Sequence, residues 1–535
     1  MREVLPRLLS TLVVVSALAV PLLAADPPGK PNIVVILVDD MGFSDLGCYG
    51  GEIPTPNLDR LAAGGLCFSQ FYNTARCCPT RASLLTGLYS HQTGVGHMVE
   101  DGKLPGYRGR LNDQCVTLAE VLRPAGYLTA MSGKWHVGQN HGVAPWNRGF
   151  DRSLNAAAGG FYYADNPRAE LYLNGDKLAL DDPRLPRDWY TTDLWTEFGI
   201  RFVDEAVKEQ KPFFLYLAHN APHFPIQAPE ADVAKFRGKY RAGWDRLREE
   251  RLKRQVEMGL IKKEWALSPR PPAVKAWDSL TEEEKDRFDH IMAIAAASVH
   301  AMDRAVGRLV EHLQSRGQLD NTLVLFLSDN GGNAESGPQG KLEPPAGHKH
   351  TIAWTGQSWA TLENTPFRLY KHFEHEGGIS TPLIAHWPAG IKARGEWRTQ
   401  VGHLIDVMPT CVEVARASYP AEFRGQKILP MEGRSLVPAF ANKAVERGPL
   451  FWEHEGHRAV CEGKWKLVAQ NGRPWELFDM EADRTELHDL AGAMPEKVKV
   501  MAGQWDAWAK RANVLPKPGA AGETKKAADK AKKKG

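Results

Sequence analysis

Residues 33–38 read IVVILV, an unbroken run of β-branched and aliphatic side chains. Such runs are typical of strands buried on both faces, as in a parallel sheet covered by helices. Apolar residues at three- and four-residue steps along residues 299–313 predict a helix with one buried face. Further apolar runs lie at 213–217 (FFLYL), 323–327 (LVLFL) and 382–385 (PLIA), with a weaker one at 127–131. This alternation predicts an α/β fold with a large mixed, mainly parallel sheet sandwiched by helices.

Side chains that bind metals or exchange protons follow four of these strands. They are Asp39 and Asp40 after the first run, Lys134 and His136 after the weaker run, His223 after 213–217, and Asp329 with Asn330 after 323–327. Ligands of open α/β sheets bind at the carboxyl ends of the strands, so the pattern predicts one shared site. Three carboxylates and an amide offer hard oxygen ligands, which suit Ca²⁺ or Mg²⁺ better than Zn²⁺. Taken singly, each pair has a second interpretation as a helix or turn cap.

The first 25 of the 535 residues have the three parts of a signal peptide. Arg2 and Arg7 supply the positive end, residues 8–20 the apolar stretch, and Ala24-Ala25 a small-residue cleavage site. This leader predicts export to a periplasm or to the cell exterior. No later segment is long and apolar enough to cross a membrane, so we expect no stable membrane span.

Composition divides the remainder into three parts. Residues 26–445 form the predicted main domain, with a charged insertion at about 230–286 whose charges are expected to be mostly solvated. Short apolar alternations around Asn471-Gly472 predict a small antiparallel subdomain over residues 446–516, closed by a helix. Residues 517–535 form a Lys-rich tail that is predicted to be disordered. Without this tail and the leader the chain is slightly acidic, which gives no support for nucleic-acid binding.

Cys77 begins the segment CCPTRASLLTG, residues 77–87, in a chain with an odd number of cysteines, seven. An odd count in an exported protein leaves at least one thiol unpaired or chemically used. C-x-P-x-R followed by A-S-L-L-T-G resembles the signature of the sulfatase family, although Thr80 stands where Ser or Ala is commoner. Later blocks of the chain also resemble that family, in the same order: GKWHVG, APHFP, SDNGG and NTPFRLYKHFEHEGGI.

The resemblance implies an arylsulfatase-like hydrolase of the alkaline phosphatase superfamily. Cys77 would be oxidised after translation to formylglycine by a formylglycine-generating maturation enzyme, and the substrate would be a sulfated small molecule or carbohydrate. A hydrated formylglycine divides sulfate ester hydrolysis into two easier steps, as covalent catalysis does.

Roles implied by the resemblance are assigned position by position. Arg81 would orient the nucleophile, Lys134 would contact sulfate, and His136 would accept the proton that triggers sulfate release. His223 and Lys371 would contact sulfate and assist the leaving oxygen. The metal, Ca²⁺ with Mg²⁺ as the alternative, would be held by Asp39, Asp40, Asp329 and Asn330.

Two other functions fit the same residues. The first is a phosphate or phosphonate monoester hydrolase on the same fold, because sulfate and phosphate are both tetrahedral oxyanions. The second is a sulfated-glycan-binding pseudoenzyme in which Cys77 is never converted.

Overall fold

The structure is a computed structural model that describes residues 29–343 and 351–518. The predicted signal peptide at 1–25 lies outside these residues, as does the predicted tail from residue 519 onward. Within the described ranges, no helix combines the length and the apolar character needed to cross a membrane.

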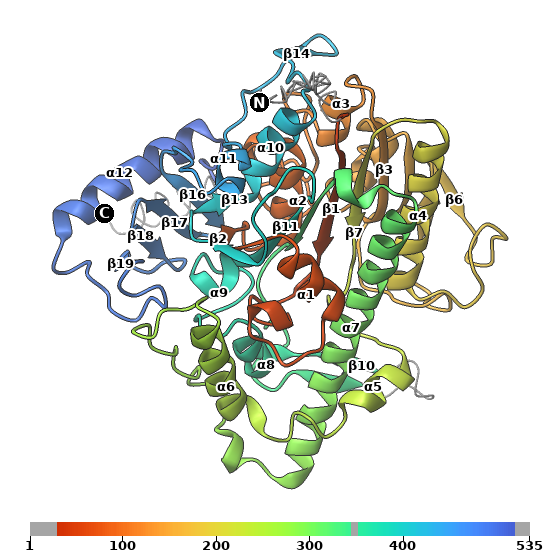
Figure 1. Cartoon of the computed structure of the whole chain (residues 1–535). Coiled ribbons are helices and arrows are strands. Elements are labelled where there is room, and N and C mark those ends of the chain that lie inside the picture. The colour runs from red at the N-terminus through yellow and green to blue at the C-terminus, as the bar shows by residue number, and fades with distance from the viewer. Residues whose placement is uncertain (1–28, 344–350, 519–535) are drawn as a thin grey trace, which may run out of the picture.

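A sheet of eleven strands forms the centre of the molecule (Figure 1). Its five central strands are parallel and lie in the order β8 (Thr322–Ser328), β1 (Asn32–Val38), β7 (Phe213–Ala218), β3 (Leu128–Lys134) and β4 (Arg152–Ala156). Beyond β8 lie β11 (Ser380–His386), antiparallel to β8, then β2 (Leu66–Tyr72), β12 (Glu396–Arg398) and β13 (Gly402–His403). Beyond β4 lie β5 (Leu171–Leu173) and β6 (Asp176–Leu178), both antiparallel. The prediction of a mixed, mainly parallel sheet is confirmed.

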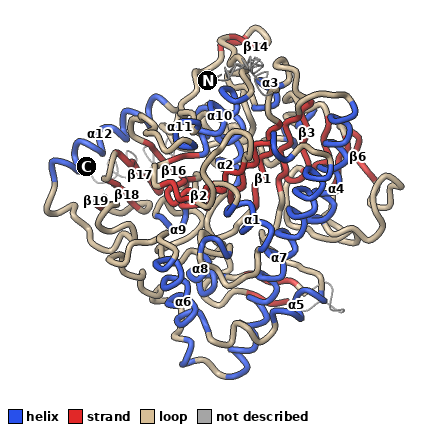
Figure 2. Tube along the Cα trace, in the orientation of Figure 1, coloured by secondary structure: helices blue, strands red, loops and turns tan. Residues whose placement is uncertain are grey.

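Helices cover both faces of this sheet, because each central strand buries side chains in both directions. In β1, Val34 and Ile36 pack on one face against α1 (Pro56–Ala63), α4 (Thr191–Lys208) and α7 (Glu282–Ser315). Ile33 and Val35 pack on the other face against α2 (Cys77–Thr86), α3 (Leu118–Leu122) and α10 (Val407–Val414). Figure 2 shows the strands between these two helical layers. The remaining helices of this part are α5 (Glu230–Phe236), α6 (Gly243–Glu257), α8 (Gly356–Glu363), α9 (Glu376–Ile379) and α11 (Val437–Phe440), and two-stranded sheets are formed by β9 (Lys341–Glu343) with β10 (Ile352–Trp354) and by β14 (Glu422–Phe423) with β15 (Gln426–Lys427).

A separate four-stranded antiparallel sheet lies near the C-terminus, as predicted (Figure 1). One helix, α12 (Pro495–Arg511), packs Trp505 and Trp508 against this sheet. The strands are β16 (Leu450–His454), β17 (His457–Glu462), β18 (Trp465–Ala469) and β19 (Glu476–Asp479).

One strand boundary differs from the sequence interpretation. The weak run at 127–131 continues as β3 up to Lys134. Within it, Gly133 adopts a φ of +125° and lies so close to Ala218 that a Cβ atom would be 1.9 Å from its carbonyl oxygen, which only glycine permits. Helix α2 begins at Cys77, with Pro79 in its first turn. Proline is tolerated in the first turn of a helix, where backbone N–H groups have no intrahelical partner.

Helix α6, in the charged segment at 230–286, buries charges that the sequence interpretation left mostly in solvent. Arg251 has no exposed side-chain area and donates to Asp45 Oδ1 at 2.8 Å and to Glu52 Oε2 at 2.8 Å. Arg248, also buried, donates to the backbone and side chain of Ser268. The contacts of Arg251 fix α6 to the loop that follows β1.

We expect Arg251→Ala to lower the free energy of unfolding by about 3–5 kcal/mol, because it leaves the buried Asp45 carboxylate without its cation. The control is Arg246→Ala on the same helix, whose side chain is 71% exposed and pairs with Glu250. Exposed pairs of this kind contribute at most about 1 kcal/mol. Urea denaturation midpoints of the two variants and the parent measure the difference. Equal midpoints for the two variants would contradict the assignment.

Candidate active site

The carboxyl ends of four adjacent parallel strands meet at one edge of the sheet. Asp39 and Asp40 follow β1, Asp329 and Asn330 follow β8, His223 follows β7, and Lys134 and His136 come from the end of β3. Helix α2 adds Cys77 and Arg81, and the segment between α8 and α9 adds Lys371. We call these ten residues the strand-tip cluster. All ten residues singled out from the sequence are therefore brought together.

On one side of the cluster, Asp39 and Asp329 share cationic partners. Lys134 Nζ lies 2.6 Å from Asp39 Oδ2, and Arg81 Nη2 lies 3.2 Å from the same oxygen and 2.8 Å from Asp329 Oδ2. The side chains of all four residues are at most 1% exposed. Although burial opposes it, the charge of Lys134 holds the pKa of Asp39 well below its usual value. Burial and the neighbouring Asp39 charge raise the pKa of Asp329 well above its usual value.

On the other side, Asp40 lies beside polar groups from three loops. Lys371 Nζ lies 2.8 Å from Oδ1, and Asn330 Nδ2 donates to the same oxygen at 2.7 Å. His223 Nε2 lies 3.7 Å from Oδ2. The backbone of Asp40 has a φ of +65° and its N–H donates to Asp329 Oδ1 at 3.2 Å. This left-handed conformation, uncommon outside glycine, presents both aspartates of the pair to the same site.

Two buried oxygen atoms suit a cation. In the part of the chain that the structure describes, Asp39 Oδ1 and Asn330 Oδ1 accept no hydrogen bond. Buried polar atoms without a partner are rare in native proteins and point to a bound water or ion. The carboxylates of Asp39, Asp40 and Asp329 supply further oxygen ligands of the hard type that Ca²⁺ and Mg²⁺ take. These residues therefore fit a divalent cation, which would also oppose the raised pKa of Asp329.

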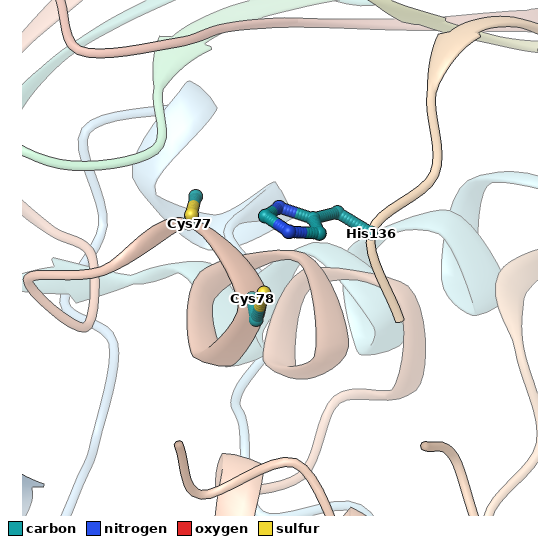
Figure 3. A group of neighbouring side chains, drawn as sticks. All are labelled: Cys77, Cys78 and His136. Atoms are coloured by element: carbon teal, nitrogen blue, oxygen red, sulfur yellow. The ribbon is translucent and has the colours of Figure 1, made fainter. Parts of the chain in front are cut away.

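Cys77 is the first residue of α2 and lies beside His136. Figure 3 shows that the His136 imidazole reaches from the loop after β3 toward the first turn of α2, where Cys77 and Cys78 lie. The two sulfur atoms and one ring nitrogen are all within 4.8 Å of one another. A hydrogen bond from Cys78, with the charge of Lys134 and contact with His136, lowers the pKa of the Cys77 thiol well below its usual value, although burial opposes it.

The two histidines and two lysines of the cluster carry opposite pKa shifts. Burial, assisted for His136 by the charge of Lys134, lowers the pKa of His136 and of His223. Burial also acts to lower the pKa of Lys134 and of Lys371, but Asp39 and Asp40 respectively outweigh it and raise both. The lysines are therefore charged at neutral pH, whereas His136 and His223 favour the neutral form that accepts a proton.

Sequence reasoning missed several partners of the cluster. Asn333 Nδ2 donates to Asp40 Oδ2 at 2.9 Å, and Glu335 Oε2 accepts from Lys371 Nζ at 3.2 Å. Thr80 Oγ1 donates to the backbone oxygen of Asp329 at 2.6 Å. Asn333 and Glu335 follow Asn330 closely in the chain, which was the only available signal for them.

The sequence matches the model of the sulfatase family over residues 31–417. Residues 367–506 match a second family, the C-terminal part of N-sulphoglucosamine sulphohydrolase. An uncharacterized sulfatase of Schizosaccharomyces pombe is 35% identical, covering 91% of this chain and 95% of that protein. An arylsulfatase of Klebsiella aerogenes is 34% identical, over 76% of this chain and 91% of the relative.

A solved structure gives the same picture for the fold. The crystal structure of Ps i-CgsB in complex with k-i-k-neocarrahexaose superposes with a TM-score of 0.67 at 28% identity, covering 90% of this chain and 92% of that one. With a family match over most of its length, the chain belongs to the sulfatase family of sulfuric ester hydrolases.

Proposed function

We propose that this sulfatase cleaves sulfate esters to an alcohol or phenol plus inorganic sulfate, using a formylglycine made from Cys77 and one divalent cation. The observation that supports this most strongly is the position of Cys77. It stands at the start of α2, where its sulfur meets His136 and where Lys134 and Arg81 on one side and Lys371 on the other surround it with positive charge. A sulfate ester is an anion, so such a ring of cations would neutralise it.

The proposed cation is Ca²⁺, with Mg²⁺ as the alternative. Asp39, Asp40, Asp329 and Asn330 would hold it, and the unpaired Oδ1 atoms of Asp39 and Asn330 support this assignment. When bound, the cation supplies positive charge that polarises the sulfate group. Without it, Lys134 and Lys371 already pair with Asp39 and Asp40, and Arg81 lies between Asp39 and Asp329. A divalent cation thus adds the positive charge that an anionic substrate requires.

Formylglycine at position 77 would require a maturation enzyme. When hydrated, it supplies one hydroxyl that attacks sulfur and a second that allows sulfate to be expelled as the aldehyde re-forms. The proposed export of the chain, based on residues 1–25, would bring the mature enzyme to a periplasm or to the cell exterior.

The side chains around position 77 have distinct proposed tasks. Lys134 and Lys371 contact the sulfate oxygens, and Arg81 orients residue 77. His136, held neutral by burial and by the charge of Lys134, accepts the proton that accompanies sulfate release. His223 Nδ1 contacts the carbonyl oxygen of Phe224 at 2.5 Å, which leaves Nε2 to exchange a proton with the leaving oxygen.

The proposed substrate is a sulfated carbohydrate, with an aryl sulfate as the other class. A pocket of about 580 Å³ borders His223 through Phe224, whose ring stacks on the imidazole at a centroid distance of 4.5 Å. Gln227 and Trp354 also line it, which combines a hydrogen-bonding group with an aromatic surface of the kind that small polar ligands use. Relatives support both classes, since one is an arylsulfatase and another, at 28% identity, is human N-acetylgalactosamine-6-sulfatase.

The test of the function compares matched sulfate and phosphate esters with the purified, matured enzyme. We expect kcat/KM to favour the sulfate ester, and Cys77→Ala to lower kcat by at least about a thousandfold because the nucleophile is lost. Cys78→Ala is the matched control, expected to lose about tenfold or less, since Cys78 occupies the variable position of the signature. Mass analysis of the tryptic peptide 77–81 reports conversion of Cys77.

A preference for the phosphate ester would favour the monoester phosphatase function instead. An unconverted thiol in protein from the native host, with sulfated glycans bound but not cleaved, would favour the pseudoenzyme.

We expect removal of the divalent cation to abolish turnover without unfolding the protein, because the strand tips are held by the sheet. Dialysis against a chelator followed by assay with added Ca²⁺ or Mg²⁺ measures this. Asp329→Asn should raise the Ca²⁺ concentration needed for half-maximal reactivation by tenfold or more, because it removes one charged ligand (about 1.4 kcal/mol per tenfold). Full activity of the chelated enzyme would contradict the proposal.

The acidic limb of kcat for a chromogenic aryl sulfate should lie below pH 6.5, the usual pKa of histidine. His136 acts in its neutral form, so a lowered pKa preserves activity as pH falls through 6.5, and activity is lost only when pH falls through the lowered value. The phenolate released from a chromogenic aryl sulfate needs little protonation, so the titration of His223 should not affect the pH dependence of kcat. In Lys134→Met, the acidic limb of the remaining activity should shift to higher pH, because the variant removes a positive charge that lowers the pKa of His136. An unmoved limb would contradict this cause.

A further inference from the structure

A second group of imidazoles lies outside the strand-tip cluster, around the turn between β16 and β17. His454 ends β16, Glu455 begins the turn, and His97 comes from the loop after the short helix η2 (Ser90–Thr93). His97 Nε2 lies 3.2 Å from Glu455 Oε1, and His454 Nε2 lies 3.6 Å from the same oxygen. One ligand atom from each residue can be chosen so that all three lie within 4.8 Å of one another. Three potential ligands from two parts of the chain therefore converge.

His454 is the unusual member of this group. It is fully buried, and across residues 29–343 and 351–518 neither of its ring nitrogens makes a hydrogen bond. A separation of 3.6 Å from Glu455 is too long for one. A buried polar group without a partner costs about 1–3 kcal/mol, so native proteins rarely keep one. A ligand placed beside Nε2 would remove that cost. Burial also lowers the pKa of His454 to about 4, which leaves a free lone pair at neutral pH.

Glu455 is held in place by a third histidine. Its Oε2 atom lies 2.8 Å from His372 Nδ1, which directs Oε1 toward His97 and His454. Hydrogen-bonded partners of this kind orient the ligands of metal sites. His372 Nε2 in turn contacts Glu335 Oε1 at 2.9 Å, and Glu335 pairs with Arg76 at 2.7 Å. Arg76 also contacts the ring of His372, so its guanidinium lies beside this chain of contacts.

We propose that His97, His454 and Glu455 form a second metal site that takes Zn²⁺ or a similar transition-metal ion. Two imidazole nitrogens and one carboxylate oxygen are a common zinc ligand set, distinct from the oxygen set of the strand-tip cluster that suits Ca²⁺. The side chains of His97 and Glu455 are 42% and 34% exposed, so the ion has a path from solvent and room for a water ligand. Bound there, it would tie the C-terminal sheet to the loop after η2.

The test measures binding of Zn²⁺ to the full-length protein, with excess Ca²⁺ present to fill the oxygen site. We expect a zinc ion that is lost in His454→Ala, and an affinity about tenfold to a hundredfold weaker in His372→Ala, which removes the orienting partner of Glu455 but no ligand. The matched control is His457→Ala, which lies opposite His454 in the same hairpin and should retain the ion. Zn²⁺ should also raise the melting temperature of the parent and of His457→Ala, but not of His454→Ala.

Zinc bound by Cys77, Cys78 and His136 must be told apart from this site. Substitution of Co²⁺ does so, because thiolate ligands give intense charge-transfer absorption and imidazole and carboxylate ligands do not.

If His454→Ala fails to fold, His97→Ala replaces it, since that side chain is partly exposed. Unchanged zinc affinity in His97→Ala would overturn the proposal. The proposal would also be overturned if the protein bound no metal and these variants changed only KM, because the imidazoles would then contact the substrate instead. Binding is measured without turnover, so this proposal and the sulfatase mechanism can fail separately.

Discussion

The burial of mutually compensating charges at the strand tips is the constraint on which the rest of the structure depends. Asp39, Asp329, Arg81 and Lys134 are almost completely shielded from water. Removing any one of them would leave an unpaired charge in a low-dielectric environment, which is far more costly than keeping the set. The sheet holds these four buried charges in paired positions, because its strands are fixed by continuous apolar packing on both faces. Three strand ends and helix α2 then supply charged groups whose positions are determined by the core rather than by flexible loops.

The spacing of the C-x-P-x-R signature has a geometric reason in this structure. Cys77 and Arg81 are four residues apart, so they lie on the same face of α2, and the proline between them occupies the first turn. Arg81 anchors that face to Asp39 and Asp329. The first residue of the helix is therefore placed relative to the carboxylates by one rigid turn. A shift of one residue would direct the arginine away from the strand tips and release the start of the helix.

Much of this arrangement could be predicted from the sequence. Buried runs such as residues 33–38 predict strands because their composition leaves no polar face, and the polar groups after them then have to meet at one sheet edge. Lys371 has no such signal, since it comes from a loop between two short helices and was identified only by resemblance. Asn333 and the convergence on Glu455 were missed because they depend on the path of loops. Buried Arg251 was missed because its charged neighbours predict a solvated helix equally well.

The C-terminal sheet is part of the active-site architecture rather than an appendage. Glu376, at the start of α9, is fully buried and accepts from Lys466 Nζ at 2.8 Å and from Arg484 Nε at 2.9 Å. Both cations come from the C-terminal region, whereas Glu376 follows Lys371 by five residues. The segment that carries Lys371 toward Asp40 is thus fixed at its far end by charges from β18 and from the loop after β19. Because unpaired charges would remain buried on both sides, the two parts of the chain cannot separate without disturbing the position of Lys371.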